Sequence, residues 1–358
     1  MLSQKTNKPS SAWTSKIEGL AEFDNHESIF FFYDRATGLK SFISIHNSKL
    51  GPAVGGTRMF LYSSETEALS DVLRLSKAMT YKCALAGVSF GGGKSVIIND
   101  PQRKNKKILK AYAQKINTLN GNFYTGQDMG ISKSDVGLML KYSDYFIGKP
   151  GLAEDPAPYA ALSTFYSIQT AMKKLYGSED LNGKTIAIKG VGNVGMNLIK
   201  LLAKTGAKLI VADIDKEKIN KIKSTHKLIA IASPKVIHKV ECDIYSPCAM
   251  GKEFNFKNVK QVKASVICGG ANNQLTSNEV GNILFKRNIL FIPDYVANAG
   301  GLINVVDELE SGGYKKTRVL TRIENIKKTL KNILDLADRK NIHPNYVSDQ
   351  MAKKIIGK

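Results

Sequence analysis

Two lysines lie on either side of a glycine-rich stretch that suits a small-molecule site. Lys82 precedes this stretch, and Lys94 directly follows three consecutive glycines, which let a backbone approach a bound molecule closely. If both ammonium groups enter one pocket, one could pair with a carboxylate while the other, in its neutral form, acts as a base. Each lysine taken alone is more simply a solvated surface residue, so this interpretation depends on the glycine context.

An aspartate lies between two further glycines. Asp128 follows Gly126 and Gln127 and precedes Met129 and Gly130. A carboxylate in this setting could bind an amine or relay a proton. It could equally cap a turn or a helix, so both interpretations stay open at this point.

A second glycine-rich segment has the sequence of a dinucleotide-binding loop. It spells Gly-x-Gly-x-x-Gly between an expected strand, Thr185–Lys189, and an apolar helix that extends to Lys204. In this context the glycines allow a tight turn and close approach of a pyrophosphate, which then lies at the helix N-terminus. Asp213 ends the next expected strand, where an acid accepts the ribose hydroxyls and favours NAD over NADP. The cofactor-binding residues that this pattern indicates are Gly190, Gly192, Asn193, Val194, Gly195 and Asp213.

The elements that must position these residues fall into two groups. Before Pro150 the pattern mixes a hairpin, helices and a further strand, which is typical of an α+β unit. Afterwards short apolar strands alternate with helices, which predicts a parallel, doubly wound sheet. The expected strands are Ile29–Phe32, Ser41–Ile45, Ser95–Ile98, Thr185–Lys189, Lys208–Ala212, Leu228–Ala232, Ile244–Tyr245, Ala264–Cys268 and Ile289–Ile292. The expected helices are Ser64–Lys82, Lys106–Leu119, Ala160–Leu175 and one amphipathic helix over Thr321–Ala352.

The composition is that of a folded protein with an unusual excess of positive charge. Hydrophobic residues make up 43% and charged residues 23% of the 358 residues, which excludes a disordered chain. There are 52 Lys and Arg against 31 Asp and Glu, a net charge of +21. Only eight of the 52 are arginine, the residue that nucleic-acid sites favour. A solvated, lysine-rich surface is therefore favoured over a nucleic-acid partner.

Several other classes are disfavoured. The sequence has no apolar run long enough for a membrane span and no apolar segment near Met1 typical of a signal peptide, so we expect a cytoplasmic protein without a membrane partner. Four cysteines form no Cys-x-x-Cys pair and five histidines form no cluster. We therefore expect neither a disulfide scaffold nor a metal site.

Seven segments taken together resemble the leucine/phenylalanine/valine dehydrogenase branch of the glutamate dehydrogenase-like amino acid dehydrogenases. They occur in the family's order within residues 28–335. They are Gly51-Pro-Ala-Val-Gly-Gly-Thr-Arg58, Leu75-Ser-Lys-Ala-Met-Thr-Tyr-Lys82, Phe90-Gly-Gly-Gly-Lys94, Gly190-Val-Gly-Asn-Val-Gly195, Cys242-Asp-Ile-Tyr-Ser-Pro-Cys-Ala249, Ala271-Asn-Asn-Gln274 and Pro293-Asp-Tyr-Val-Ala-Asn-Ala-Gly-Gly301. The resemblance implies NAD-dependent oxidative deamination of an L-amino acid to a 2-oxo acid, ammonium and NADH.

The resemblance also implies a role for each matching residue. Lys94 corresponds to the catalytic lysine that activates the attacking water, and Asp128 to the aspartate that holds the amine and moves protons. Lys82 corresponds to the lysine that binds the substrate carboxylate, helped by the backbone of Gly55 and Gly56. Asn272 corresponds to the asparagine near the substrate and the nicotinamide ribose.

The same resemblance indicates an apolar substrate. Val54 stands where glutamate-specific relatives have a lysine for the side-chain carboxylate, and an apolar group cannot compensate a buried carboxylate. Leu302 and Val305 correspond to the remaining pocket wall. Gly126 with Leu302 is a phenylalanine-type pair, whereas Ala271–Leu275 reads closer to leucine-type enzymes, so the branched-chain and phenylalanine types both stay open.

Two residues depart from the leucine-type pattern. Gln127 replaces a glutamate, and Ala160 stands where threonine is usual. Neither change removes a proposed catalytic group, but both could alter affinity or turnover.

The resemblance predicts a two-domain α/β protein with a cleft. We expect a substrate-binding and oligomerisation domain over 1–147, a Rossmann NAD-binding domain over 148–335, and a C-terminal helix, 336–358, that packs back on the first domain. The family suggests a homo-oligomer. The alternative, motivated by the charge of +21, is a non-catalytic lysine-rich binding or sensing protein with the same fold.

Overall fold

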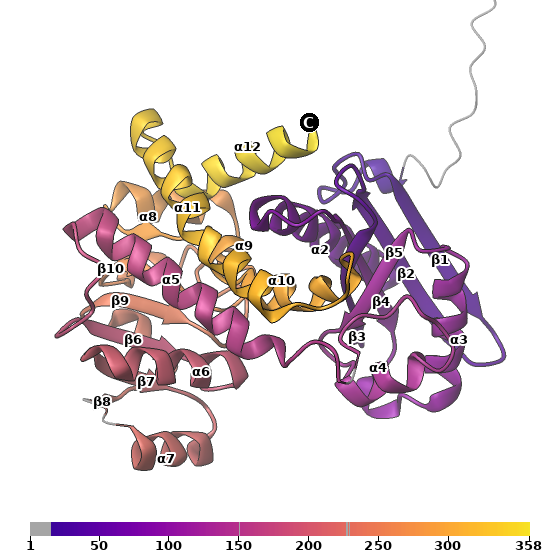
Figure 1. Ribbon diagram of the computed structural model, residues 1–358, viewed down its shortest axis with the longest axis horizontal. Helices are drawn as coiled ribbons and strands as arrows, with labels where there is room; N and C mark the ends of the chain where they lie inside the picture. The colour runs from indigo at the N-terminus through magenta and orange to yellow at the C-terminus, as the bar shows by residue number, and fades with distance from the viewer. Residues whose placement is uncertain (1–15, 150, 227, 229) are drawn as a thin grey trace, which may run out of the picture. The chain divides into compact units, whose positions relative to one another are not determined.

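The computed structural model describes residues 16–149, 151–226, 228 and 230–358 of the chain (Figure 1). The Cα positions group these residues into two units. The first contains residues 16–80 and 90–146, and the second contains Tyr81–Ser89 and the described residues from Ile147 onward. This division agrees with the expected two-domain architecture, while the proposed limits 1–147 and 148–335 stay predictions.

The first unit is built on a mixed sheet of five strands. The strands lie in the order β1-β2-β4-β3-β5, with β1–β2 and β2–β4 antiparallel and β3 parallel to both β4 and β5. The expected hairpin is confirmed, whereas the strand expected from Ser95 already begins at Gly91, so the three glycines are themselves part of the sheet. The strands are β1 (Ser28–Asp34), β2 (Leu39–Asn47), β3 (Ala53–Phe60), β4 (Gly91–Ile98) and β5 (Phe123–Gln127).

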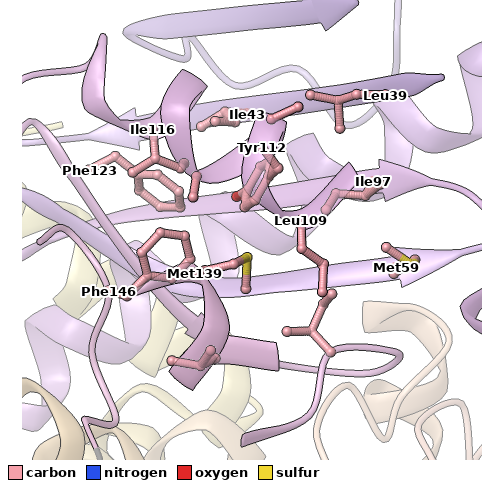
Figure 2. Close-up of a cluster of buried hydrophobic side chains, with 14 of the residues drawn as sticks. Leu39, Ile43, Met59, Ile97, Leu109, Tyr112, Ile116, Phe123, Met139 and Phe146 are labelled. Atoms are coloured by element: carbon pink, nitrogen blue, oxygen red, sulfur yellow. The ribbon is translucent and has the colours of Figure 1, made fainter. Parts of the chain in front are cut away.

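Helices cover both faces of this sheet. On one face, Phe42 and Val96 pack with apolar residues of α2. On the other face, Ile43 and Ile97 pack with Tyr112 of α3 in the cluster of Figure 2. Because successive strand residues point to opposite faces, Lys94 lies on the same face as Val96, toward α2. The helices are α2 (Glu65–Ala86), α3 (Lys106–Asn117) and α4 (Lys133–Met139), with a short 3-10 turn, η1, at Pro101–Arg103.

The second unit contains the parallel, doubly wound sheet that the alternation of strands and helices predicted. Its six strands lie in the order β11-β10-β9-β6-β7-β8, and every neighbouring pair is parallel. Part of the expected strand Leu228–Ala232 falls on residue 229, outside the described residues. The strands are β6 (Thr185–Lys189), β7 (Lys208–Ala212), β8 (Ala230–Ile231), β9 (Cys242–Pro247), β10 (Ala264–Ile267) and β11 (Leu290–Phe291).

The helices of this unit follow and cover the strands. They are α5 (Pro156–Tyr176), α6 (Asn193–Leu202), α7 (Lys216–Thr225), α8 (Asn278–Lys286), α9 (Asp294–Ala297), α10 (Gly300–Val306), α11 (Lys316–Lys340) and α12 (Pro344–Ile356), with 3-10 turns η2 (Ala203–Thr205), η3 (Ile237–Lys239), η4 (Val259–Gln261) and η5 (Asp307–Leu309). The single helix expected over 321–352 is wrong: α11 and α12 are separate. Asn341 takes the left-handed conformation at φ 51°, and Pro344 cannot continue a preceding helix.

The last helix packs within the second unit. α12 contacts α11 and α8, and the Tyr295 hydroxyl of α9 lies 2.6 Å from the Ser348 hydroxyl. The packing of 336–358 on the first domain stays a prediction.

Candidate functional site

A lysine–aspartate ion pair joins β4 to the segment that directly follows β5 in the first unit. Lys94 of β4 and Asp128, directly after β5, approach to 2.6 Å between Nζ and Oδ2. The lysine side chain is only 9% exposed and the aspartate 26%. The two residues that we singled out separately in the sequence are therefore direct partners in one ion pair. The ammonium of this pair is largely buried.

Glycines allow the strands and α2 to approach this pair. A Cβ at Gly92 would lie 2.0 Å from the Thr80 backbone nitrogen of α2, so only glycine lets the helix lie this close to β4. A Cβ at Gly56 of β3 would lie 2.9 Å from the Asp128 Cβ. Gly92 and Gly56 thus let the backbone approach closely around Lys94 and Asp128, as the glycine context predicted.

The aspartate is surrounded by positive charge. Burial by itself raises the pKa of Asp128, but the ammonium of Lys94 and the guanidinium of Arg58 outweigh burial and lower this pKa to about 2. The carboxylate is therefore ionised at any pH at which the protein works. An ionised carboxylate fits the binding of an ammonium group better than proton donation.

The sequence analysis missed the residues behind this pair. Arg58 Nε lies 3.4 Å from Asp128 Oδ2, and Arg58 Nη1 donates to Asp71 of α2 at 2.9 Å. Asp71 also accepts hydrogen bonds from Arg74 and from the Tyr62 hydroxyl. Arg58 belongs to a segment that carried the resemblance, but no spacing rule joins it to Asp71, because they occupy a strand and a helix.

The other substrate residues expected in this unit lie on adjacent strands. Gly55 and Gly56 of β3 are opposite Thr125 and Gly126 of β5. The side chain of Val54 is fully buried. The structure therefore brings Gly56 and Gly126 together on the paired strands β3 and β5, beside Asp128.

The dinucleotide loop of the second unit has the predicted position between β6 and α6. Gly190 has φ 96°, a conformation that favours glycine, and a Cβ there would meet Ala249 at 2.6–2.8 Å. Gly192 is the N-cap of α6 without a side-chain cap, and a Cβ there would meet no described atom within 4 Å. The open backbone N–H groups of Asn193, Val194 and Gly195 in the first turn of α6 thus fit a pyrophosphate.

Asp213 lies next to this loop. Directly after β7, its carboxylate accepts the backbone N–H groups of Val191 and of Asp215. A carboxylate has further acceptor sites beyond these two. Asp213 therefore both holds the glycine loop and can bind hydroxyl groups.

The remaining predicted substrate residues also belong to the second unit. Lys82 Nζ donates to Asn272 Oδ1 at 3.3 Å, and Asn298 Nδ2 donates to the same oxygen at 2.8 Å. Asn298 was not singled out in the sequence. With Asn272 Oδ1 occupied, its amide Nδ2 is the group left to donate to a ligand.

The predicted pocket-wall residues lie on α10, and the two residues that depart from the leucine-type pattern lie on β5 and α5. Leu302 and Val305 lie on α10, with Leu302 buried. Gln127 is the exposed last residue of β5, and Ala160 lies in α5. The joining of Leu302 and Val305 with Val54 in one pocket, and of Lys82 with Lys94, stays a prediction, because the two groups belong to different units.

The described residues hold no group of three or more His, Cys, Asp and Glu side chains arranged to bind a metal. Within the same part of the chain, none of the helices combines the length and apolar character that crossing a bilayer requires. The expected cytoplasmic location and lack of a metal stay predictions.

A doubly wound sheet with an open glycine loop, together with a second α/β unit that carries a buried lysine–aspartate pair, defines a two-domain oxidoreductase of the NAD(P)-binding type. Comparison with known families makes this specific. Residues 26–145 match the Glu/Leu/Phe/Val dehydrogenase dimerisation domain, and residues 154–355 match Glutamate/Leucine/Phenylalanine/Valine dehydrogenase. The chain belongs to the Glu/Leu/Phe/Val dehydrogenase family.

Individual relatives are similar along nearly the whole chain. The leucine dehydrogenase of Geobacillus stearothermophilus is 43% identical over 337 residues, covering 93% of this chain and 91% of the relative. The phenylalanine dehydrogenase of Thermoactinomyces intermedius is 41% identical, covering 93% and 92%. The crystal structure of L-tryptophan dehydrogenase from Nostoc punctiforme has a TM-score of 0.83 at 36% identity and covers 96% and 98%. The chain is thus an amino acid dehydrogenase of the Leu/Phe type, in a family that uses NAD(P).

Proposed function

We propose that this protein oxidatively deaminates an apolar L-amino acid with NAD⁺, giving a 2-oxo acid, ammonium and NADH. The observation that carries this proposal is the largely buried ion pair of Lys94 and Asp128, which lies beside glycines of β3 and β5. Bound NAD⁺ would supply the hydride acceptor for the substrate Cα.

Asp128 and Lys94 divide the proton chemistry between them. Asp128, held ionised by its cationic neighbours, accepts the substrate ammonium as an ion pair and takes a proton as the amine becomes an imine. Lys94 in its neutral form removes a proton from water as its oxygen attacks the imine carbon. Asp128 returns its proton to the nitrogen and then takes the hydroxyl proton as the C–N bond breaks, so that ammonia leaves and the carbonyl forms. The two protons then held by Lys94 and Asp128 pass to ammonia and to solvent.

Lys82 binds the substrate carboxylate. Its ammonium donates to the amide oxygen of Asn272. The resemblance implies that the backbone of Gly55 and Gly56 also supports the carboxylate. Asn272 Nδ2 donates to the ligand, oriented by Asn298. These contacts hold the Cα in place, which reduces the entropic cost of reaching the transition state.

Asp213 makes NAD⁺ the preferred cofactor. Its carboxylate beside the glycine loop suits the 2′- and 3′-hydroxyls of the adenosine ribose and repels a 2′-phosphate.

The substrate side chain is apolar. Val54 offers no charge to a side-chain carboxylate, and Leu302 is likewise apolar. Relatives named for leucine, phenylalanine and tryptophan all support this class. Gly126 in place of a larger residue leaves room for an aromatic ring, and one methylene changes selectivity by about 10–200-fold.

We further propose that the protein is a homo-oligomer formed through the first unit. The family match for 26–145 is to a dimerisation domain, and the edge strand β1 exposes Phe31 and Tyr33 by about half. Light scattering at several protein concentrations would show a mass well above 39.2 kDa. A monomer at all concentrations would contradict this part of the proposal.

The proposed function is tested by following NADH absorbance with a panel of L-amino acids. We expect turnover with Leu, Val, Ile, Phe or Trp and at least about 100-fold lower kcat/KM with Glu. A preference for Glu would contradict the apolar pocket, and no turnover with any amino acid would contradict the proposal itself.

A further inference from the structure

Arg58 lies between two carboxylates. Its Nε faces Asp128 at 3.4 Å, and its Nη1 faces Asp71 at 2.9 Å. Its side chain is 18% exposed. A guanidinium has donors on several sides of one plane, so it can contact both acids at once, which an ammonium on a flexible stem does less well.

Asp71 is a firm anchor for this arginine. It accepts from Arg74 Nη2 at 2.6 Å and from the Tyr62 hydroxyl at 2.8 Å, in addition to Arg58. Burial raises the pKa of Asp71, but Arg58 and Arg74 outweigh it and the pKa is lowered. Asp71 therefore stays ionised and fixes the orientation of Arg58.

Charged groups from several elements surround Asp128. Lys94 from β4 and Arg58 from β3 face it directly, with Asp71, Arg74 and Tyr62 behind Arg58 on the α2 side. On the Gly130 side, Lys104 is paired with Asp135.

A base that takes protons cannot also be a constant positive charge. When Lys94 is neutral, it no longer compensates the Asp128 carboxylate. Arg58 can, because a guanidinium keeps its proton at every working pH.

We propose that Arg58, anchored by Asp71, is a positioning residue for the reaction: it holds the Asp128 carboxylate beside Lys94 and keeps it ionised while Lys94 changes its protonation state. This inference rests on the roles of Lys94 and Asp128 in the proposed function. It assigns the orientation and the ionisation of Asp128 to a residue that acts through this carboxylate.

The test compares Arg58→Gln, Arg58→Lys and Asp71→Asn with the wild type from about pH 3 to 10. Arg58→Gln removes the charge and is expected to lower kcat by about 10–100-fold. It should also raise the pKa of Asp128 by about 1–3 units from its value of about 2, so that kcat/KM gains a further acid limb, between about pH 3 and 5, beyond any that the wild type shows. Arg58→Lys keeps the charge, so it should remove most of this extra acid limb. It should restore less of the lost kcat.

Asp71→Asn separates position from charge. It frees Arg58 from its anchor but leaves the positive charge beside Asp128. We therefore expect a lower kcat without a shift of the acid limb. Arg103→Gln is the matched control, because Arg103 is 85% exposed and lies away from this network, so both kcat and the profile should be unchanged.

The outcomes distinguish the inference from the proposed function. If the wild type turns over amino acids and Arg58→Gln changes neither kcat nor the acid limb by more than twofold, the inference is overturned. If the wild type shows no turnover, the proposed function fails, and the inference is read from thermal unfolding. The deficit in Tm of Arg58→Gln should then narrow as pH falls from 6 to 3, because protonation relieves its uncompensated carboxylates. A constant deficit overturns the inference.

Poor folding of Arg58→Gln would not end the test. The double variant Arg58→Gln/Asp71→Asn leaves no unpaired charge between the two positions, so it is the better-folded substitute. It should show the acid limb of the single Gln variant. The NADH affinity of every folded variant should match the wild type, since a change there would reveal general damage instead of a positioning role.

Discussion

The two proposed sites of this protein are built by different means. In the first unit, Lys94, Asp128, Arg58 and Asp71 come from two strands, a loop and a helix, and their charged side chains form one chain of ion pairs. In the second unit, Gly190–Gly195 is one continuous turn, and its properties come from backbone N–H groups and from the absence of side chains. The first arrangement suits proton chemistry, and the second suits a ligand held by its phosphates.

This contrast predicts that substitutions in the two sites affect different measurements, turnover for the first site and cofactor binding for the second. Loss of a charge from the network of Lys94, Asp128, Arg58 and Asp71 should lower turnover and spare cofactor binding. Addition of a methyl group at Gly192 of the second unit should weaken cofactor binding and leave the fold intact.

The largest expected effect is that of Lys94→Ala. Removal of the base should lower kcat by about 10³-fold or more, while NADH still quenches or enhances fluorescence with wild-type affinity. Lys40→Ala is the control, because Lys40 contacts Glu65 and the Tyr33 ring at the exposed surface. Activity of Lys94→Ala within tenfold of the wild type would show that Lys94 is not the base.

Gly192→Ala tests the backbone site. Its Cβ would meet no described atom within 4 Å, so the free energy of unfolding should change by less than about 1 kcal/mol. If the pyrophosphate lies here, the same methyl group should raise the NADH Kd by about tenfold or more.

The matched control for this change is Gly137→Ala. Gly137 lies in α4 and also has open space around a Cβ, so alanine there should leave the NADH Kd unchanged. Equal Kd values for Gly192→Ala and the wild type would place the pyrophosphate elsewhere.

Asp213→Ser sharpens the assignment of the cofactor. Loss of the carboxylate should raise the NADP⁺/NAD⁺ ratio of kcat/KM by about tenfold, because the repulsion of a 2′-phosphate is removed. Asp215→Ser removes a neighbouring carboxylate but keeps a side chain that can cap α7, so its ratio should stay near that of the wild type. If both variants shift the ratio equally, general electrostatics and not Asp213 selects the cofactor.

The smallest expected effect is on the pH dependence of stability. Burial lowers the pKa of His343 from 6.5 to about 4. Between these values the unfolded chain binds a proton that the folded chain does not, so stability falls by up to about 1.4 kcal/mol per pH unit as pH drops. Asp128 acts in a different window: its contribution is present above its unfolded pKa and is lost only as pH falls toward 2.

His343→Asn tests this difference between the units. Asparagine keeps an N-cap acceptor for α12, which His343 supplies to the Asn345 N–H, but carries no proton. The slope of unfolding free energy between pH 6.5 and 4 should therefore be shallower in the variant, with turnover at pH 8 unaffected. The lowered pKa of the buried His238 adds a slope of the same sign that remains in the variant. Identical slopes would mean that His343 does not titrate in this range.

The sequence by itself determined the features whose parts are neighbours along the chain. The glycine loop, the strand before it and Asp213 after the next strand were all predicted, because the turn, the period of the strands and the glycine conformations are local properties. The hairpin of the first unit and the doubly wound sheet likewise followed from alternating and apolar runs, whereas the strands β3 and β5 were not predicted. The break at Asn341 was missed, because the amphipathic pattern continues through it while the backbone does not.

Only the tertiary structure decided which charges meet. Lys94 and Asp128 are 34 residues apart, and each alone could have been a surface group or a turn cap. Their pairing depends on the placement of β3 between β4 and β5, and that of Arg58 with Asp71 on the position of α2 over the sheet. Ion pairs of this kind arise from strand order and helix packing, which no short stretch of sequence encodes.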